Sequence, residues 1–358
     1  MKKILFVQRL DAVNKHGGDH SLLLYYKGLL EKRLGFNCEV YTNQSILDSY
    51  DCLFFFNIDR PMYYYDLIEI CINKKTPYVI YTLHHPEEGI LNYLKNGTFG
   101  IRKFISFLSN YDPVRYEKYL SVLKSLKNLT LKSNYDIRKV QEKIILNAKF
   151  VFTSSKLEAL EIEKDICTGN FVTLPHYYET KECFLEKEKN LIVCAGRIES
   201  RKNQIVVLKI AKLNPDKKFV FVGNYNDTDK KYVNLFKKIA SNINNVEVVS
   251  GLNKNEYYQY LCRADIFISL SYFEVVSLVE LDAFAAGCKM IIGKYSYITE
   301  FIDGDDIQYL DFHEFRNLDF YVKKLQDINI KRDYRNLNLL SEEVIREILE
   351  NVFIGEVV

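Results

Sequence analysis

The stretch Arg263–Gly293, RADIFISLSYFEVVSLVELDAFAAGCKMIIG, decides the fold, because it reads as strand, short loop, helix and strand. Asp265–Leu270 is a compact apolar run, which is typical of a buried parallel strand. Leu278–Ala286 has apolar residues at helical spacing, and Gly287 can close that helix. Unpaired N–H groups and the helix dipole favour an anion where a helix begins after a strand. The stretch therefore predicts an α/β fold with an anion site in the loop Ser271–Ser277.

The chain is long enough for two domains of this kind. It has 358 residues, of which 48% are hydrophobic and 27% charged, so it is globular and too long for one ordinary core. Alternating strands and helices in both halves predict parallel sheets. Thr180–Asn190 is short, charged and poorly periodic. We therefore predict an N-terminal domain over 1–178, a linker over 179–190 and a C-terminal domain over 191–340.

Composition limits the binding partners of this protein and the cellular compartment in which it is expected. A formal net charge of +2 argues against a general nucleic-acid binder. The eight cysteines are scattered, with no CxxC pair and no zinc spacing, and they predict buried thiols in a reducing cytoplasm. No apolar run reaches the length of a membrane span, and the amino terminus reads as a first strand.

Two spaced motifs carry chemistry. Glu274 and Asp282 stand eight positions apart around the start of the predicted helix. The segment Gly196–Asn203, GRIESRKN, follows a predicted strand and places Lys202 five residues after Arg197. Arginine offers a planar fork of donors and lysine a mobile point charge, and together they can stabilise a departing diphosphate. The alternative interpretations are a buried helix with two incidental acids and a surface loop with three cations.

These motifs resemble those of the retaining GT-B glycosyltransferases, above all the GT4-like family, glycosyl transferases group 1. The resemblance implies two Rossmann-like domains facing each other across a cleft, with a terminal helix at 341–358 that crosses back to the N-terminal domain. It implies that Glu274 contacts the donor sugar and that Asp282 or Glu280 holds the ribose. It also implies that Arg197, Lys202 and the backbone at Ser277 and Leu278 bind the donor diphosphate. The chain departs from the family pattern in having Asp at 282 and Ser at 277.

Other positions match the family more weakly. The pair Gly17-Gly18 lies where the family places a glycine-rich turn facing the donor phosphates. His84, in Thr82-Leu83-His84, matches the histidine that approaches the hydroxyls of the donor sugar. The turn at Gly251-Leu252 matches the one beside the nucleobase. An ordinary turn would explain the two glycines equally well, and a loop histidine bonded by backbone is the alternative for His84.

The resemblance implies a retaining, metal-independent hexosyltransferase. Its donor would be a nucleotide sugar, UDP-linked first and GDP-linked next, with no cofactor besides this co-substrate. Its acceptor would be a hydroxyl of a glycan or of a lipid-linked acceptor, in bacterial surface polysaccharide synthesis at the cytoplasmic side of the membrane. The alternatives are a nucleotide-sugar epimerase and a catalytically silent GT-B partner of another transferase.

The segment 101–143 is basic and aromatic. It holds ten Lys and Arg against four Asp and Glu, interleaved with aromatic residues such as Phe104 and Phe107. Such a surface suits an anionic headgroup, so a peripheral membrane contact is one interpretation. A solvated basic face on ordinary helices is the other, and the sequence favours it slightly.

Overall fold

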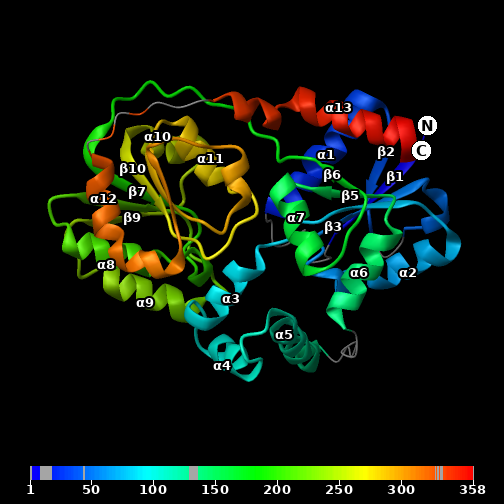
Figure 1. Cartoon of the computed structure of the whole chain (residues 1–358), viewed down its shortest axis with the longest axis horizontal. Helices are drawn as coiled ribbons and strands as arrows, with labels where there is room; N and C mark the ends of the chain where they lie inside the picture. Colours follow the sequence, from blue (N-terminus) through cyan, green and yellow to red (C-terminus); the bar gives the residue numbers. More distant parts are fainter. Residues whose placement is uncertain are drawn as a thin grey trace. The chain divides into compact units, whose positions relative to one another are not determined.

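The computed structural model contains two six-stranded parallel sheets, each covered by helices on both faces (Figure 1). It describes residues 2–8, 18–42, 45–128, 136–326, 328, 330 and 334–357. The chain divides into two compact units. Unit 1 consists of Met1–His85, Ser121–Tyr178 and Asn338–Val358, and unit 2 of Pro86–Leu120 and Glu179–Leu337.

The first sheet has the strand order β2-β1-β3-β4-β5-β6, and all its neighbouring strands are parallel. Its elements, in chain order, are β1 (Lys3–Val7), α1 (Gly18–Leu34), β2 (Asn37–Val40), β3 (Cys52–Phe56), α2 (Tyr65–Lys74), β4 (Tyr78–Tyr81), α6 (Ile137–Asn147), β5 (Phe150–Thr153), α7 (Lys156–Asp165), β6 (Phe171–Thr173) and α13 (Glu342–Val352).

The strands of this sheet are apolar throughout because both faces are buried. Alternate residues such as Leu5, Leu53 and Ile80 pack against α2 and α6. On the opposite face aromatic rings stack, with Phe6 and Phe54 centred 5.0 Å apart. The sequence period of two thus sends its large side chains into two separate cores.

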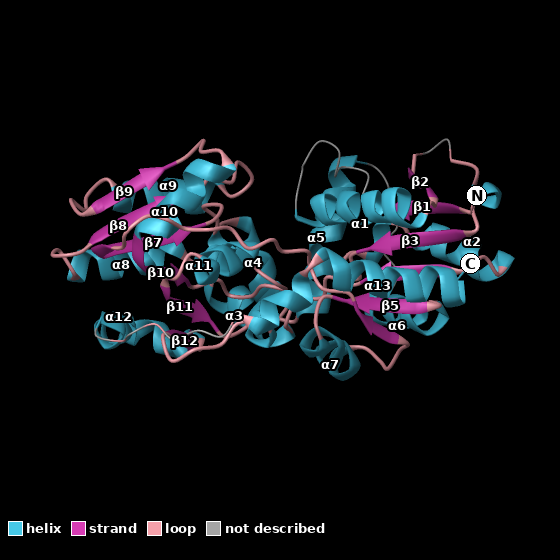
Figure 2. Cartoon of the chain, turned by 90° about the horizontal axis from the view of Figure 1, so that it is seen from above, coloured by secondary structure: helices cyan, strands magenta, loops and turns pink. Residues whose placement is uncertain are grey.

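The second sheet has the order β12-β11-β10-β7-β8-β9 and is also wholly parallel. Figure 2 shows its strands from above. Its elements are β7 (Glu188–Ala195), α8 (Gln204–Leu213), β8 (Lys218–Val222), α9 (Lys230–Ala240), β9 (Val246–Val249), α10 (Lys254–Arg263), β10 (Ala264–Ser269), α11 (Leu278–Ala285), β11 (Lys289–Gly293), β12 (Ile307–Leu310) and α12 (Leu318–Gln326). Figure 1 shows α10 and α11 on one face and α8 and α9 on the other.

The units differ from the predicted domain boundaries in two places. The helices α3 (Glu87–Asn96) and α4 (Ile101–Leu108), with the start of α5 (Pro113–Asn128), pack with unit 2 and not with the first sheet. Aromatic contacts explain this, because the Tyr93 ring lies edge-on to Tyr272 with centroids 5.6 Å apart. The predicted linker belongs to unit 2 and already contains the start of β7.

At the carboxyl end the chain rejoins unit 1 from Asn338 onward, three residues before the terminal helix predicted to cross back at 341–358. Phe353 packs in the first core, with its ring centroid 5.9 Å from that of Phe54. Arg33 of α1 donates to Glu342 of α13 at 2.9 Å. Among the described residues, no helix is long and apolar enough to cross a membrane.

Candidate active site

The second sheet reverses its strand order between β7 and β10. Ligands of open α/β sheets bind outside the carboxyl ends of the strands at such a point. Ile192 of β7 is in register with Ile266 of β10, so both strands end at the same edge. The loops that follow these strands, at 196–202 and 270–277, carry the two predicted motifs. The topology therefore brings both motifs to one edge of unit 2.

Two glycines fix the path of the loop after β7. Gly196 and Gly223 have positive φ angles of 131° and 154°. A Cβ on Gly223 would lie 2.1 Å from the carbonyl oxygen of Gly196, a separation that no side chain allows. The N–H of Gly196 also donates to the carbonyl of Val222 at 2.8 Å.

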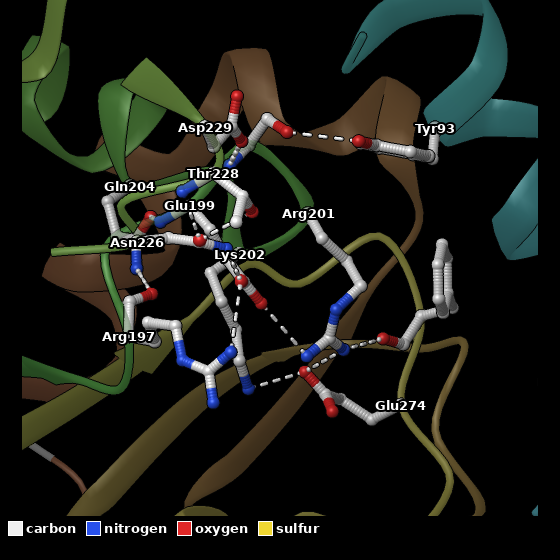
Figure 3. Close-up of polar contacts among 12 residues, drawn as sticks. Tyr93, Arg197, Glu199, Arg201, Lys202, Gln204, Asn226, Thr228, Asp229 and Glu274 are labelled. Atoms are coloured by element: carbon white, nitrogen blue, oxygen red, sulfur yellow. Dashed lines mark hydrogen bonds and ion pairs between the residues drawn. The ribbon is translucent and has the colours of Figure 1, made fainter. Parts of the chain in front are cut away.

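The short 3-10 turn Ser200–Lys202 is anchored on both sides. The N–H of Ser200 donates to the Asp229 carboxylate at 2.8 Å. The Arg201 carbonyl accepts the N–H of Tyr272 at 2.9 Å, which ties this turn directly to the loop after β10. The turn therefore holds its cationic side chains at a fixed place beside that loop (Figure 3).

Two of these cationic side chains form ion pairs with Glu274. Lys202 Nζ donates to Glu274 Oε1 at 2.5 Å, and Arg201 Nη1 lies 2.9 Å from the same oxygen. Figure 3 shows both side chains pointing at this carboxylate. Burial alone would raise the pKa of Glu274, but the charges of Arg201 and Lys202 hold it well below its usual range. Glu274 is therefore ionised at any physiological pH.

Arg201 is the centre of the cluster and bridges its two carboxylates. Besides Glu274, its guanidinium donates to Glu199 Oε1 at 3.2 Å and to the Phe273 carbonyl at 2.9 Å. Glu199 is fixed in turn by Asn226, whose Nδ2 donates to Oε2 at 2.6 Å. Burial opposes the charge, yet the two carboxylates raise the pKa of Arg201 further. Its planar fork of donors suits this bridging position.

Arg197 is differently placed from the other two cations. Its side chain is 54% exposed, and its Nη1 lies 3.9 Å from Glu199 Oε2. Its backbone carbonyl accepts from Gln204 Nε2 at 2.8 Å, which fixes the main chain below the exposed side chain. Arg197 is therefore the cation of this edge that is best placed to meet a ligand from solvent.

The start of α11 supplies backbone donors. Ser277 is its N-cap, with extended backbone and no side-chain capping bond. Among the hydrogen bonds of the described residues, none uses the amide N–H of Ser277, Leu278 or Val279. Such groups at a helix amino end favour an anion. This arrangement is compatible with the predicted diphosphate contacts at Ser277 and Leu278, which stay a prediction.

Glu280 of α11 is fully buried. Its side chain accepts from Ser269 Oγ at 2.8 Å and from Ser296 Oγ at 3.5 Å. Burial, and then the nearby charge of Glu274, raise the pKa of Glu280 to about 8. The carboxyl of Glu280 is therefore protonated near neutral pH, and the ribose contact of Glu280 or Asp282 stays a prediction.

Asp282 faces the segment that precedes β7. Lys181 Nζ donates to Asp282 Oδ1 at 3.0 Å. Lys181 is held by Tyr258, whose hydroxyl donates to the Lys181 carbonyl at 2.9 Å and whose ring lies 4.9 Å from Nζ. A ribose bound at Asp282 would share this carboxylate with Lys181.

The turn after β9 lies at the same edge of the sheet. Gly251 has a φ of 76°, and its N–H donates to Asn224 Oδ1 at 2.9 Å. The amide of Gly251 is thus already used, and the neighbouring Leu252 is half-buried. A nucleobase contact here stays a prediction and would use the remaining backbone groups.

His84 lies in unit 1, and both of its ring nitrogens are occupied. Nδ1 lies 2.6 Å from Asp59 Oδ1, and Nε2 lies 3.0 Å from Asp165 Oδ2. Burial would lower the pKa of His84, but the two carboxylates raise it to about 10. The buried imidazolium therefore bridges two carboxylates, and it would have to leave one of them to reach a sugar hydroxyl.

The predicted glycine turn falls at the limit of the described chain. Gly17 lies outside the described residues, and Gly18 is the first residue of α1. A Cβ on Gly18 would meet nothing within 4 Å. The space around Gly18 therefore does not require glycine, and its phosphate contact stays a prediction.

A comparison with known families matches one segment of the chain, which contains the second sheet. Residues 175–325 match the family described as Glycosyl transferases group 1. Over these residues the chain is similar to the group 1 glycosyltransferases. The matched segment contains both motif loops and every strand of the second sheet. A sequence search of curated proteins finds no match to the chain.

Solved structures share the fold of this chain over nearly its full length. Anabaena HepE in complex with UDP and glucose has 13% identity and a TM-score of 0.61, covering 98% of this chain and 95% of that one. Sucrose-phosphate synthase from Thermosynechococcus elongatus has 12% identity and a TM-score of 0.64, with 99% and 95% covered. The lipopolysaccharide outer core galactosyltransferase WaaB has 9% identity and a TM-score of 0.64, with 99% and 100% covered. These likenesses confirm the GT-B fold.

Sequence reasoning missed Arg201 and Glu199. Both stand inside the GRIESRKN segment, but nothing in its letters shows which cation turns inward. A signal was present in Glu199, which stands between two basic residues, because an arginine that turns inward needs carboxylate partners.

In the described part of the chain, no three His, Cys, Asp or Glu side chains could together hold a metal ion. Metal independence stays a prediction.

Proposed function

We propose that this glycosyltransferase is a retaining, metal-independent enzyme that moves a hexosyl group from a UDP-sugar to a hydroxyl of a glycan or lipid-linked acceptor. The observation that carries the proposal is the meeting of Arg197, Lys202 and Glu274 with the unpaired amide groups of α11 at one sheet edge. Cations and helix N–H groups suit a diphosphate, and a carboxylate suits sugar hydroxyls.

Several observations support the choice of donor and setting. HepE was solved with UDP and with UDP-glucose, and WaaB is a galactosyltransferase of lipopolysaccharide. All eight cysteines are free, which suits the cytoplasmic side of a bacterial membrane. We therefore favour UDP over GDP and a surface polysaccharide as the product.

In the proposed reaction, the bond between the anomeric carbon and the diphosphate oxygen breaks as the acceptor oxygen bonds to the same face of that carbon. The acceptor proton passes to an oxygen of the departing diphosphate, so no protein nucleophile is needed. Arg197 and Lys202 stabilise the negative charge that grows on UDP. Glu274, fixed by Arg201, orients the sugar, and Asp282 holds the ribose.

A thermal-shift panel of UDP-, GDP-, ADP-, dTDP- and CMP-sugars in EDTA tests the donor site. We expect one nucleotide class to raise the melting temperature by mass action. Arg197→Ala should abolish that shift and lower turnover about 100-fold, as loss of a transition-state charge partner does. Arg263→Ala is the matched control, because Arg263 precedes β10 at the opposite end of the strand and pairs with Glu188.

The outcomes separate the alternatives. A shift that needs a divalent cation would refute metal independence. Binding without turnover, restored by a second subunit, would indicate a silent GT-B partner. Interconversion of the nucleotide sugar without an acceptor would indicate an epimerase.

A further inference from the structure

The carboxylate of Asp282 is paired with a lysine from a distant segment of the chain. Lys181, which precedes β7, donates from Nζ to Asp282 Oδ1 at 3.0 Å. The side chain of Lys181 is 41% exposed, so its ammonium group stays open to a ligand from solvent. In the reaction proposed above Asp282 holds the ribose, while Lys181 takes no part.

The helix α10 holds the segment of Lys181 in place. The hydroxyl of the buried Tyr258 donates to the Lys181 carbonyl at 2.9 Å, and Lys181 Nζ lies 4.9 Å from the centre of the same ring. Farther along the segment, Lys187 Nζ donates to the carbonyl of Leu261 at 3.1 Å. Tyr258 and Leu261 both belong to α10, which lies beside α11 on one face of the sheet (Figure 1). The ammonium group is therefore positioned in advance next to the Asp282 carboxylate.

The geometry of α11 places this pair where a ribose would follow a diphosphate. Leu278, whose amide group we assign to the diphosphate, is the first residue of α11. Asp282 comes four residues later, about 6 Å along the axis and on the same face of the helix. Helical side chains lean toward the amino end, so the Asp282 carboxylate leans back toward the anion site. In a nucleoside diphosphate a single CH2 group joins the ribose to the α-phosphate, so a ribose here would meet both Asp282 and Lys181.

An ammonium group beside a carboxylate is complementary to two adjacent hydroxyl groups. A hydroxyl both donates and accepts hydrogen bonds, whereas an ammonium group only donates and an ionised carboxylate only accepts. The 2′,3′-diol of a ribose can therefore donate to Asp282 and accept from Lys181 at the same time. A 2′-deoxyribose has one hydroxyl fewer and cannot satisfy both charges. We propose that Lys181 is a further donor-binding residue, which together with Asp282 selects ribonucleotides over 2′-deoxyribonucleotides.

The inference rests on the proposed function, because it requires the diphosphate at the amino end of α11. One hydrogen bond to a charged group changes affinity by about 10- to 150-fold. Partial exposure of Lys181 screens its charge and places the expected effect near the low end, about tenfold. The ion pair itself should contribute little to folding, because exposed pairs are screened by solvent, so the free Lys181→Met protein should melt within about 3 °C of wild type.

Calorimetric titration with UDP and GDP, each against its 2′-deoxy analogue, tests the proposal, because the two members of a pair share base and diphosphate. We expect the wild type to bind one ribonucleotide about tenfold more tightly than its 2′-deoxy analogue. In Lys181→Met this preference should fall below about threefold, mainly through weaker binding of the ribonucleotide. Lys181→Arg keeps the charge and should retain part of the preference. Lys189→Met is the matched control, because Lys189 is exposed at the start of β7, at the opposite end of that strand from the site.

The preference separates ligand contact from a structural role. A purely structural role of Lys181 would weaken both members of a pair equally and leave the preference in Lys181→Met unchanged, which would overturn the proposal. Tighter ribonucleotide binding by Lys181→Met would also overturn it, because the lysine would then block Asp282. A wild type that binds UDP or GDP without preferring the ribose refutes this proposal alone. A wild type that binds neither nucleotide refutes the proposed donor site, and this proposal with it.

Discussion

Replacing Arg201 with Met should expose how much the cluster depends on one guanidinium. The side chain is 27% exposed and bridges Glu274 at 2.9 Å and Glu199 at 3.2 Å. Removing one partner of a buried ion pair costs about 3–5 kcal/mol, because the remaining charge stays buried. Partial exposure, and the retained Lys202, place the expected loss near the low end, about 3 kcal/mol.

Thermal denaturation measures this loss. For a unit of roughly 150–250 residues, 1 kcal/mol corresponds to about 2–4 °C, so we expect a drop of about 6–12 °C. The pH dependence gives an independent reading. A carboxyl with a depressed pKa, such as Glu274, stabilises the fold above its unfolded pKa of about 4.3 and loses this as pH falls through the folded value. In Arg201→Met the folded pKa rises, so acid destabilisation should begin at higher pH than in the wild type.

A double-mutant cycle decides whether the unpaired carboxylate is the cause. Glu274→Gln removes the charge that Arg201→Met leaves behind. The two changes together should therefore cost at least about 1 kcal/mol less than the sum of the single changes. Arg201→Lys, which keeps the charge but loses the fork, should fall between wild type and Arg201→Met. Additive losses in the cycle, or a melting temperature of Arg201→Met within 1 °C of wild type, would refute the reasoning.

Three further predictions concern buried groups. Because the pKa of Glu280 is raised to about 8, its protonated carboxyl stabilises the fold fully below about pH 4.3, and this contribution is lost as the pH rises to about 8. In Glu280→Gln the free energy of unfolding, measured by denaturation, should therefore depend less on pH over this range. Because the pKa of His84 is raised to about 10, its imidazolium stabilises the fold fully below about pH 6.5, and this contribution is lost as the pH rises toward 10. His84→Asn should lack that loss. If the free energy of unfolding of this variant falls with pH as in the wild type, the ion pairs of His84 are contradicted. Gly223→Ala puts a Cβ 2.1 Å from the Gly196 carbonyl and should cost about 3 kcal/mol, whereas Gly18→Ala, with nothing within 4 Å, should melt like wild type.

The sequence predicted the second sheet and its two motif loops because those signals are local. The strand predicted at Asp265–Leu270 lies at β10, and the helix predicted at Leu278–Ala286 matches α11 within one residue. Apolar runs, a glycine close to a strand end and a cation pair at fixed spacing all lie within a few residues of one another. The parallel order of the strands then brings Lys202 to Glu274.

The sequence did not predict contacts between distant segments. Arg201 and Arg197 look alike in the loop, and the ion pair that distinguishes them joins Arg201 to Glu274, 73 residues later. His84 follows a strand as predicted, but Asp59 and Asp165, which occupy its nitrogens, lie in other parts of the chain. The attachment of α3 and α4 to unit 2 depends on tertiary packing of aromatic rings, which no local pattern encodes.

That attachment brings α3 into contact with the loop of the carboxylate that we assign to the donor sugar. A Cβ on Gly89 of α3 would lie 2.5 Å from the Tyr272 carbonyl and 2.8 Å from the Phe273 Cβ, so helix and loop are in direct backbone contact. Glu274 is the next residue, and its N–H is held by the Tyr295 carbonyl at 2.9 Å. Close-packed groups transmit displacement because they have no free volume to absorb it. A displacement of α3 would therefore reach the Glu274 loop, so the helix excursion at Pro86–Leu120 helps to fix the position of that loop.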